Sequence, residues 1–553
     1  MTDPRPLTEV EAIKAESRYL RGPIHDDLQS DAPNVSAASE QLMKFHGIYS
    51  QDNRDVRRER TLAKEPLDYS FMIRVVIPGG RLTSEQWLAL DGVSDAIADG
   101  SLRLTTRQAI QFHGVRKGGL RPLAAELHQR LMTSFGACGD VVRNVVSCPL
   151  HDHAESEALR ALPERLALAF RPNTKAWWEV FVEGELAATG ENQTERSFYG
   201  ETYLPRKFKI GVASANENCI DVYAQDVGII PAVHPELGQG YQLVVGGGLG
   251  RSYANPDTFA RLAEPLTFVL DDELETVIEA VVATYRDLGD RTDRKRARMK
   301  YVVADLGLAV FRDHVEQRLG RELRAPITIE RLGEADDHLG WSEQHDGTWI
   351  LGVAVRAGRL RDNNVSSPKA ALRSIAERYP VSFTLTALQD VLITGIQAED
   401  RAAIDELLSA HGVVGVDSLS PLDRSALACP ALPTCSQALT ESERRLPEMV
   451  NLLDAELTTV GLSGAPLQLR MTGCPNGCAR PAVAEVGIVG RTKSTYDIYL
   501  GGGPNGDRLA RLHEEKVKFE DIPSVLNPLL AQWGEERDGD ERFGEFLARK
   551  GLA

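Results

Sequence analysis

The chain has 553 residues, too many for one hydrophobic core, so three or four packed units are expected. Its 63 basic and 80 acidic residues give a formal net charge of −17, which argues against binding nucleic acid or anionic membranes through overall charge. No stretch approaches the roughly 20 apolar residues of a membrane helix, and the N-terminus lacks the features of a signal or transit peptide. We therefore expect a cytoplasmic protein that binds neither nucleic acid nor membrane.

The first sixty residues are polar and charged, and we expect a partly helical extension that wraps the body and ends in a basic segment at 54–60. Residues 69–82 form an apolar run rich in β-branched residues that ends at Pro-Gly-Gly, which predicts a strand and a turn. A helix and a second strand at 101–115 should follow. The same order of strand, helix and strand returns at 346–360, 370–379 and 381–396.

The segments after these two units also match. Residues 203–251 contain DVGII followed by YQLVVGGGLGR, and residues 467–508 contain EVGIV followed by YDIYLGGGPNGDR. Similarity over such lengths can arise by chance, but the matched order of four elements favours duplication. Aligning Val227 with Val486 then places Cys219 opposite Cys478. We predict a mixed α/β (α+β) fold with pseudo-twofold symmetry, a monomer, and a site between the halves.

Four of the seven cysteines crowd into fifty residues, with the spacing Cys429-x5-Cys435-x38-Cys474-x3-Cys478. Four thiolates from two loops suit zinc or an iron–sulfur cluster. The five-residue gap is unusual for structural zinc, and the prolines and glycine of these loops help them to wrap a bulky core. An iron–sulfur cluster is therefore favoured over zinc and over four unligated buried thiols.

Several predicted strands carry polar or cationic residues at period-two spacing, hence on one face. In residues 102–113 these are Arg103, Thr105, Arg107, Gln111 and His113. Lys207 and Lys209 flank Phe208, while Arg74 and Arg143 interrupt apolar runs. Each alone fits a solvated face or an ion pair. Together, in an acidic chain, they predict a site for a carboxylate-rich substrate or cofactor.

Over nearly its whole length the chain resembles the siroheme-containing nitrite and sulfite reductases. The family's motifs occur in order as KFHGIYSQDNRD, YSFMIRVVIPGGRL, RLTTRQAIQFHG, VVRNV, TYLPRKFK and the cysteine loops ACPALPTC and MTGCPNGCARP. The resemblance implies an N-terminal extension (1–64), two ferredoxin-like repeats (65–138 and 336–418), a siroheme-binding domain (139–335) and a cluster domain (419–553).

The resemblance also implies the cofactors, siroheme and a [4Fe-4S] cluster. The cluster would be bound by Cys429, Cys435, Cys474 and Cys478, with Cys478 also the axial ligand of the siroheme iron. Catalytic residues would be Arg74, Arg143, Lys207 and Lys209. Siroheme carboxylates or the cluster would be contacted by Arg103, Thr105, Arg107, Gln111, His113 and Asn476, and the carboxylates also by the backbone of Gly501, Gly502 and Gly503.

Some sulfite reductases of this family carry a tyrosine–cysteine thioether beside the siroheme. Tyr69 opens the strand that carries Arg74, and Cys148 follows the segment that carries Arg143. We therefore name Tyr69 and Cys148 as candidates for such a crosslink. The alternative is a packed tyrosine and an ordinary buried thiol.

The expected reaction is the assimilatory-type, six-electron reduction of sulfite to sulfide. The position of Lys209 is typically lysine in the family's sulfite reductases and asparagine in its nitrite reductases, and an extra cation favours the dianion. Nitrite reduction to ammonia is the first alternative. A non-catalytic iron–sulfur protein that binds nucleic acid through residues 291–300 is an alternative of another class.

The electron donor should be reduced ferredoxin, because the sequence shows no flavin domain and no second nucleotide site. Basic segments 54–60 and 291–300 are candidate docking patches, although both also fit solvated helix faces. Residues 501–506 match the dinucleotide pattern G-x-G-x-x-G before a helix-like segment, but their repeat partner at 246–251 does not match it.

Overall fold

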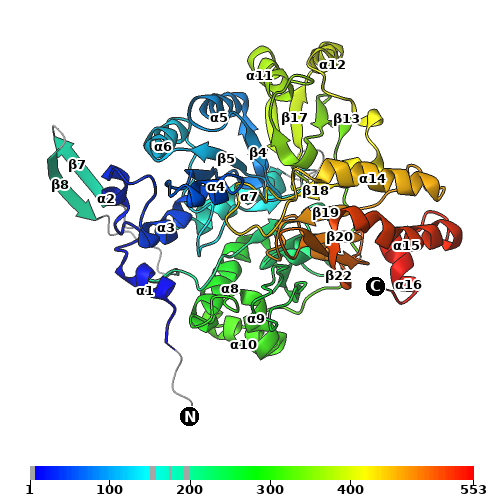
Figure 1. Cartoon of the computed structure of the whole chain (residues 1–553). Helices are drawn as coiled ribbons and strands as arrows, with labels where there is room; N and C mark the ends of the chain where they lie inside the picture. The colour runs from blue at the N-terminus through cyan, green and yellow to red at the C-terminus, as the bar shows by residue number, and fades with distance from the viewer. Residues whose placement is uncertain are drawn as a thin grey trace.

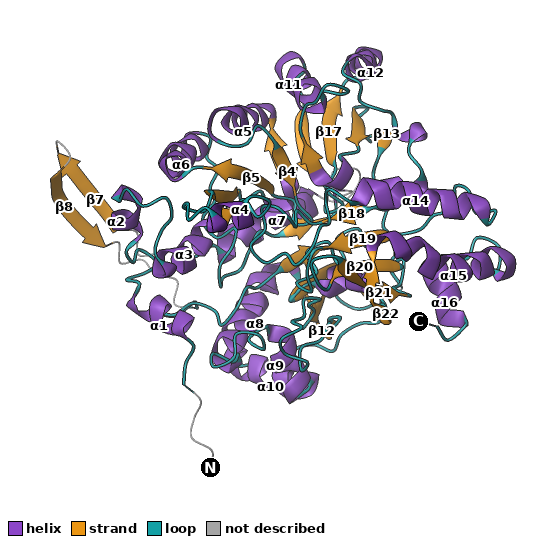
Figure 2. Ribbon diagram, in the orientation of Figure 1, coloured by secondary structure: helices purple, strands orange, loops and turns teal. Residues whose placement is uncertain are grey.

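The structure is a computed structural model that describes residues 6–149, 157–172, 177–182, 185–191, 198–329 and 331–552. Helices and strands are both present throughout the chain, as the prediction of a mixed α/β (α+β) fold requires (Figures 1 and 2). Within the described residues the strands form four five-stranded sheets and one two-stranded hairpin. The four larger sheets fall into two matching pairs, which is the duplication expected from the sequence.

The first pair of sheets belongs to the two ferredoxin-like units. One sheet has the order β1 (Ile48–Asp52), β2 (Tyr69–Arg74), β5 (Ile110–Val115), β4 (Leu102–Leu104), β15 (Arg359–Leu360). The other has the order β13 (Gly340–Glu343), β14 (Trp349–Val353), β17 (Val391–Ile396), β16 (Ser382–Leu385), β3 (Arg81–Thr83). Each sheet therefore takes its last strand, β15 or β3, from the other unit.

The two ferredoxin-like units also share one hydrophobic core. Trp87 of the first unit stacks on Phe383 of the second, with ring centroids 4.5 Å apart. Four helices gather beside these sheets at the top of Figure 1: α5 (Ser84–Ile97), α6 (Leu120–Gln129), α11 (Pro368–Arg378) and α12 (Arg401–Ala410). Helix α5 begins with a capping box, in which Thr83 and Gln86 bond each other's backbone amides.

The strands predicted at 101–115 and 381–396 are hairpins in the structure. Residues 105–109 turn between β4 and β5, and residues 386–390 turn between β16 and β17. Gln108 (φ +49°) and Gln389 (φ +76°) occupy the left-handed region at equivalent points of these turns. The predicted single face of residues 102–113 is therefore wrong at Thr105 and Arg107, which lie in the turn.

The second pair of sheets forms the two larger units. One has the order β12 (Glu264–Val269), β11 (Gly238–Val245), β10 (Val227–His234), β9 (Ile210–Val212), β6 (Val146–Ser147). The other has the order β22 (Arg511–Lys518), β21 (Thr495–Leu500), β20 (Val486–Gly490), β19 (Leu469–Thr472), β18 (Leu427–Ala428). Val227 pairs with Ile210 as Val486 pairs with Leu469, so both halves have the register that the sequence alignment assumed.

Separate helices pack with each larger unit and form two separate cores. The first unit carries α7 (Glu157–Phe170), α8 (Leu274–Leu288), α9 (Met299–Leu306) and α10 (Leu308–Leu319). The second carries α13 (Pro421–Ser425), α14 (Leu446–Thr459), α15 (Ile522–Glu536) and α16 (Phe543–Arg549). The glycine motif at 501–506 leads into strand β22, where the sequence predicted a helix, so the strand–turn–helix context of a dinucleotide site is absent there.

The N-terminal extension is partly helical, as expected, with α1 (Glu9–Glu16), α2 (Ile24–Gln29), α3 (Ala37–Met43) and α4 (Arg57–Leu62). It also contributes β1, which pairs with β2 and was not predicted. The hairpin of β7 (Trp177–Val182) and β8 (Glu185–Glu191) projects from the body (Figure 1). None of the helices described is both long and apolar enough to cross a membrane.

Candidate active site

The four clustered cysteines lie in loops that follow two neighbouring parallel strands. Cys429 comes directly after β18, and Cys474 and Cys478 lie in the loop after β19. Cys429 and Cys474 are buried, Cys435 is half-buried and Cys478 is exposed. The Gly473 amide donates to the Cys429 sulfur at 3.3 Å. Backbone hydrogen bonds also reach the sulfurs of Cys435 and Cys474.

The spacing of these sulfurs suits an iron–sulfur cluster better than a single ion. Among the described residues, one group of three or more cysteine, histidine, aspartate or glutamate side chains has its ligand atoms within 4.8 Å of one another. That group contains none of the four clustered cysteines. The four sulfurs are therefore spread more widely than the ligands of one ion. Amide groups directed at the sulfurs are the hydrogen bonds that tune cluster potentials. The residues present fit a [4Fe-4S] cluster.

The four predicted catalytic cations lie close to one another, and two of them, Arg74 and Lys209, lie close to the exposed Cys478. Arg74 at the end of β2 donates to the Cys138 sulfur at 2.9 Å. Arg143 donates to the Gly139 carbonyl through Nε and Nη2, at 3.2 and 3.0 Å. Lys207 and Lys209 precede β9 and flank Phe208, which is fully buried. The charges of Arg74 and Lys209 both interact with Cys478.

Both lysines have strongly lowered pKa values. Burial, followed by the charges of Arg298 and Arg143, holds the pKa of Lys207 well below its usual 10.5. Burial, followed by the charges of Arg107 and Arg298, does the same to the pKa of Lys209. An amine whose pKa is lowered toward neutral pH gives up a proton more readily, so these two lysines are suited to proton transfer.

A buried ion pair that the sequence did not predict holds Lys209 in place. Arg298 Nη2 donates to both carboxylate oxygens of Asp226, at 3.0 and 2.8 Å, and the Lys209 amide donates to Asp226 Oδ2 at 2.9 Å. The sequence pointed to Arg298 only as part of the basic run 291–300, which was expected on the surface. In the structure this arginine lies close to Lys207 and Lys209.

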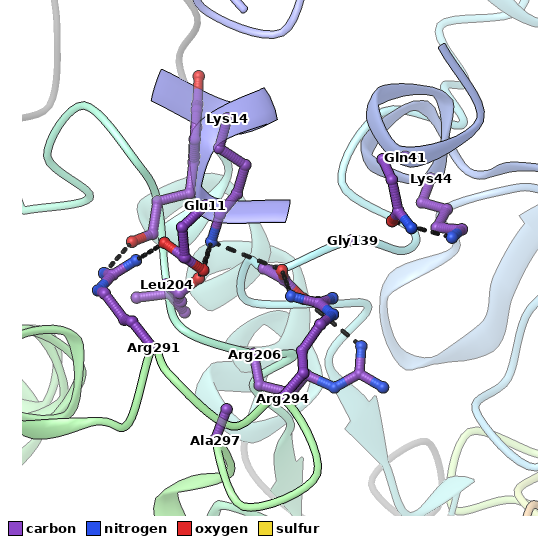
Figure 3. Close-up of polar contacts among 12 residues, drawn as sticks. Glu11, Lys14, Gln41, Lys44, Gly139, Leu204, Arg206, Arg291, Arg294 and Ala297 are labelled. Carbon is purple, nitrogen blue, oxygen red and sulfur yellow. Dashed lines mark hydrogen bonds and ion pairs between the residues drawn. The ribbon is translucent and has the colours of Figure 1, made fainter. Parts of the chain in front are cut away.

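A second network joins helix α1 to residues 139–140 and to Arg291 and Arg294; Figure 3 labels Glu11, Lys14, Gly139, Arg291 and Arg294. Arg294 donates to both oxygens of Asp140 at 2.8 and 3.0 Å, and Lys14 Nζ lies 3.7 Å from Asp140 Oδ2. Lys14 and Arg291 each pair with Glu11 at 2.5 Å. Burial would raise the pKa of Asp140, but Arg294 and Lys14 lower it to about 2. Helix α1 is thereby fastened to the site.

Two predicted cofactor contacts support the protein's own loops instead. Arg103 donates to Glu443 Oε2 at 2.9 Å and to the carbonyl of Ala428 at 2.7 Å. Ala428 directly precedes Cys429. The Thr105 hydroxyl accepts backbone bonds within its turn, from Arg107 and Ala109. Arg103 therefore braces the segment that leads to Cys429, whereas Thr105 closes a turn.

Arg107, Gln111 and His113 line the interior near Arg74. Burial and Arg143 lower the pKa of Arg107 to about 9. The Gln111 amide faces the guanidinium of Arg74, its cross-strand neighbour. Arg107 Nε and His113 Nδ1 are buried polar atoms without a hydrogen-bond partner among the described residues. Crowded cations with an unused donor fit a cofactor rich in carboxylates, as siroheme is.

Asn476 lies in the loop of Cys474 and Cys478, whereas the three glycines lie in the turn after β21. Asn476 is exposed between the two cysteines of its loop and hydrogen-bonds Cys474. The amides of Gly501, Gly502 and Gly503 donate to the carbonyls of Glu485, Ala484 and Arg508, at 3.1, 3.1 and 3.2 Å. The prediction that they bind siroheme carboxylates is wrong, because these donors are already used. A Cβ at position 502 would lie 2.3 Å from the Ala484 oxygen, which explains the glycine there.

The predicted thioether pair, Tyr69 with Cys148, is also wrong. The Cys148 thiol contacts Glu217 Oε1 at 2.6 Å, whereas Tyr69 pairs with Asp52 at the start of β2. The tyrosine and cysteine in contact at the site are Tyr49 and Cys138, which share a hydrogen bond. Burial and Cys138 raise the pKa of Tyr49 to about 12. Tyr49 lies within the motif KFHGIYSQDNRD, so the sequence contained this signal.

Comparison with known proteins agrees with this site. The family model described as the nitrite and sulphite reductase 4Fe-4S domain matches residues 138–323 and 422–553. The nitrite/sulfite reductase ferredoxin-like half domain matches residues 64–130 and 342–411.

Relatives cover the whole chain. A Myxococcus xanthus protein named "Sulfite reductase [NADPH] hemoprotein beta-component" is 43% identical over 99% of this chain and 97% of its own length. A Synechococcus elongatus "Sulfite reductase [ferredoxin]" is 40% identical over 99% of this chain and 90% of its own. The solved structure of the Mycobacterium tuberculosis NirA protein has the same fold, with a TM-score of 0.80 and 24% identity over 99% of this chain and 98% of that one. The chain therefore belongs to the nitrite and sulfite reductases, oxidoreductases that use siroheme and a [4Fe-4S] cluster.

Proposed function

We propose that this protein reduces sulfite to sulfide with six electrons, in the assimilatory manner. The observation that carries the proposal is the group of two arginines and two low-pKa lysines, of which Arg74 and Lys209 lie close to the exposed Cys478. Siroheme, when bound, would supply the iron that binds the sulfur atom and passes electrons to it. Cys429, Cys435, Cys474 and Cys478 would hold the cluster, with Cys478 shared between the two centres.

The four cations would have two roles: the arginines would bind the substrate and the lysines would supply protons. Sulfite is a dianion, and its reduction to sulfide takes up six electrons and six protons and releases three waters. Arg74 and Arg143 keep their charge and would bind and orient the oxyanion. Lys207 and Lys209 would donate protons to the departing oxygen atoms and be reprotonated from solvent.

Nitrite is the alternative substrate, and Lys209 is the residue on which the choice rests. A monovalent anion needs less positive charge than a dianion, so we expect Lys209→Asn to lower kcat/KM for sulfite more than for nitrite. Steady-state rates with both anions, for the wild type and this variant, test the proposal. Arg116→Gln, at an exposed ion pair with Asp68, is a matched control that also removes one cation. A wild type that prefers nitrite would refute the substrate assignment.

We further propose reduced ferredoxin as the electron donor, docking on the basic segment 54–60. The support is its position over the cluster loop: Arg54 donates to the carbonyls of Cys435 and Ala438, at 3.4 and 3.0 Å. Arg58 beside it is exposed. The Myxococcus xanthus relative is named an NADPH-type hemoprotein beta-component, which makes a separate NADPH-oxidising protein the second candidate.

The other basic segment, 291–300, is not a free docking patch. Arg291, Arg294, Arg296 and Arg298 pair with Glu11, Asp140, Asp305 and Asp226. Lys300 donates to backbone carbonyls, including that of Gly250 at 2.7 Å. Turnover assays with photoreduced ferredoxin, and with NADPH plus a flavoprotein reductase, distinguish the two donors. Faster turnover with the NADPH system would reject ferredoxin.

A further inference from the structure

A second group of metal-ligating side chains lies apart from the four cluster cysteines. One ligand atom each from Cys148, Glu217, Cys219 and His338 lies within 4.8 Å of all the others. Glu217 Oε1 is 2.6 Å from the Cys148 sulfur and 3.2 Å from His338 Nε2. The two cysteines and the glutamate are buried, and the His338 side chain is only 4% exposed. Thiol, carboxylate and imidazole groups that converge in the interior are the side chains that bind a metal ion in proteins.

Pseudo-symmetry places this group opposite the iron–sulfur cluster. Val146 pairs with Gly211 as Leu427 pairs with Arg470, so Cys148 after β6 occupies the position of Cys429 after β18. Gly211 pairs with Gly228 as Arg470 pairs with Gly487. With that register, Cys219 occupies the position of Cys478 without any gap in either loop.

The counterpart lacks the thiols that a cubane cluster needs. Cys474 corresponds to Ala215, because both lie four residues beyond the paired positions 470 and 211. In place of further thiols, the loop offers Glu217, and the segment before β13 offers His338. Two thiolates, one imidazole and one carboxylate make a set of four ligands of the types that bind a single zinc ion.

We propose that Cys148, Glu217, Cys219 and His338 bind one structural Zn²⁺. With zinc–ligand distances of about 2.0–2.3 Å, the edges of a tetrahedral site are about 3.3–3.8 Å long. The 3.2 Å separation of His338 and Glu217 is close to this, and the Cys148–Glu217 contact would open by about 1 Å. Two thiolates and a carboxylate on the dication leave one negative charge, which Arg480, interacting with Cys219, offsets.

The surroundings of the group are those of a closed structural site. Glu217 Oε2 accepts the amide of Asp336 at 2.9 Å, and Asp336 Oδ1 accepts the amide of His338 at 3.0 Å. The Gly333 amide donates to the Asn216 carbonyl at 2.9 Å, which fixes the two segments side by side. Such outer bonds orient metal ligands. The ion would clamp the start of the second ferredoxin-like unit, at β13, to the first of the two larger units.

Zinc content and zinc X-ray absorption of the holoenzyme test this site, because neither the cluster nor siroheme contributes at the zinc edge. We expect about one zinc per chain, with two sulfur neighbours at about 2.3 Å and two nitrogen or oxygen neighbours at about 2.0–2.2 Å. The variants Cys219→Ser and His338→Ala should lose most of the zinc but keep the iron content and the optical spectrum. His345→Ala, an exposed histidine seven residues away, should keep the zinc.

Each other outcome rejects the proposal. Protein from zinc-supplemented medium that holds no zinc, or a disulfide that joins Cys148 to Cys219 in peptide maps, would show that the group is not a metal site. Four sulfur neighbours would place the ion in the cluster loops, and nitrogen and oxygen neighbours alone would indicate surface binding. If the variants fail to fold, the absorption spectrum of the wild type decides by itself.

Discussion

Arg298 and Asp226 form a buried ion pair close to the two lysines of the site, with Arg298 Nη2 at 2.8 and 3.0 Å from the two carboxylate oxygens. The two partners shift the pKa of Lys209 in opposite directions. The charge of Arg298 lowers the pKa of Lys209, and the charge of Asp226 raises it. Together with burial and the charge of Arg107, the balance between them sets how readily the ammonium group gives up its proton.

Substituting either partner should therefore move the pH dependence of catalysis. A lysine that donates protons must be protonated, so kcat/KM for sulfite falls as the pH rises through its pKa. Asp226→Asn removes a favourable charge and lowers that pKa, which shifts the fall to lower pH. Arg298→Gln removes a repelling charge and should shift the fall to higher pH.

The opposite directions are the test, since structural damage alone would not move the two profiles apart. The measurement is kcat/KM against pH for both variants and the wild type. Two profiles displaced in the same direction would contradict the assignment of the lysines as proton donors.

Asp140→Asn should destabilise the protein by about 3–5 kcal/mol, because Arg294 would lose its bidentate counter-ion and Lys14 would keep only Glu11. Denaturant unfolding measures the loss. Asp305→Asn, at the exposed pair with Arg296, is the control and should change stability by less than about 1 kcal/mol.

The same carboxylate should make the wild type sensitive to acid. Its pKa of about 2 lies below the usual 3.8, so its stabilising contribution is complete above about pH 4 and is lost as the pH falls toward 2. Asp140→Asn should lack this part of the acid transition. If Asp140→Asn lost stability in acid in the same way as the wild type, the network of Glu11, Lys14 and Arg294 would not depend on this charge.

Arg58→Glu should weaken electron donation by ferredoxin. The side chain is exposed beside Arg54, and reversing its charge replaces attraction to an acidic partner by repulsion. We expect a several-fold higher KM for ferredoxin at low ionic strength and a smaller difference at high salt. Lys295→Glu, on the basic segment whose arginines pair internally, should leave the KM for ferredoxin near that of the wild type. Equal effects of the two variants would remove segment 54–60 as the docking site.

Gly502→Ala should destabilise the protein by about 1–3 kcal/mol, because its methyl group would collide with the Ala484 carbonyl. Gly118→Ala, where an added methyl meets nothing within 4 Å, is the matched control. Thermal unfolding of both variants measures the effect. A stable Gly502→Ala protein that has lost only siroheme would restore the cofactor role once predicted for this loop.

Much of the fold could be predicted because its signals are local or repeated. The four cysteines, the two lysines around Phe208 and the matched VGI segments identified the cluster loops and the duplication. The exchanged strands β3 and β15 have three and two residues, too few to show a period. Their pairing is a long-range property that no local pattern contains.

The same limit explains the errors in the site. Arg298 and Arg294 read as surface charges because their partners, Asp226 and Asp140, are 72 and 154 residues away. Tyr69 was named as the crosslink candidate because it shares a strand with Arg74. The neighbouring strand β1, which brings Tyr49 opposite Met72, lay in a region expected to be an extension only.

The exchange of edge strands β3 and β15 between the two ferredoxin-like units bears on how such a protein could arise. A single-copy ancestor would have one short strand with no sheet of its own to join, and its neighbouring sheet would end in unpaired backbone groups. Two identical subunits that exchanged this strand would give the strand a sheet and pair the edge of that sheet. Fusion of their genes would then fix the exchange within one chain. By that route the symmetric dimer precedes the duplicated chain, and afterwards only one half needs to keep the chemistry.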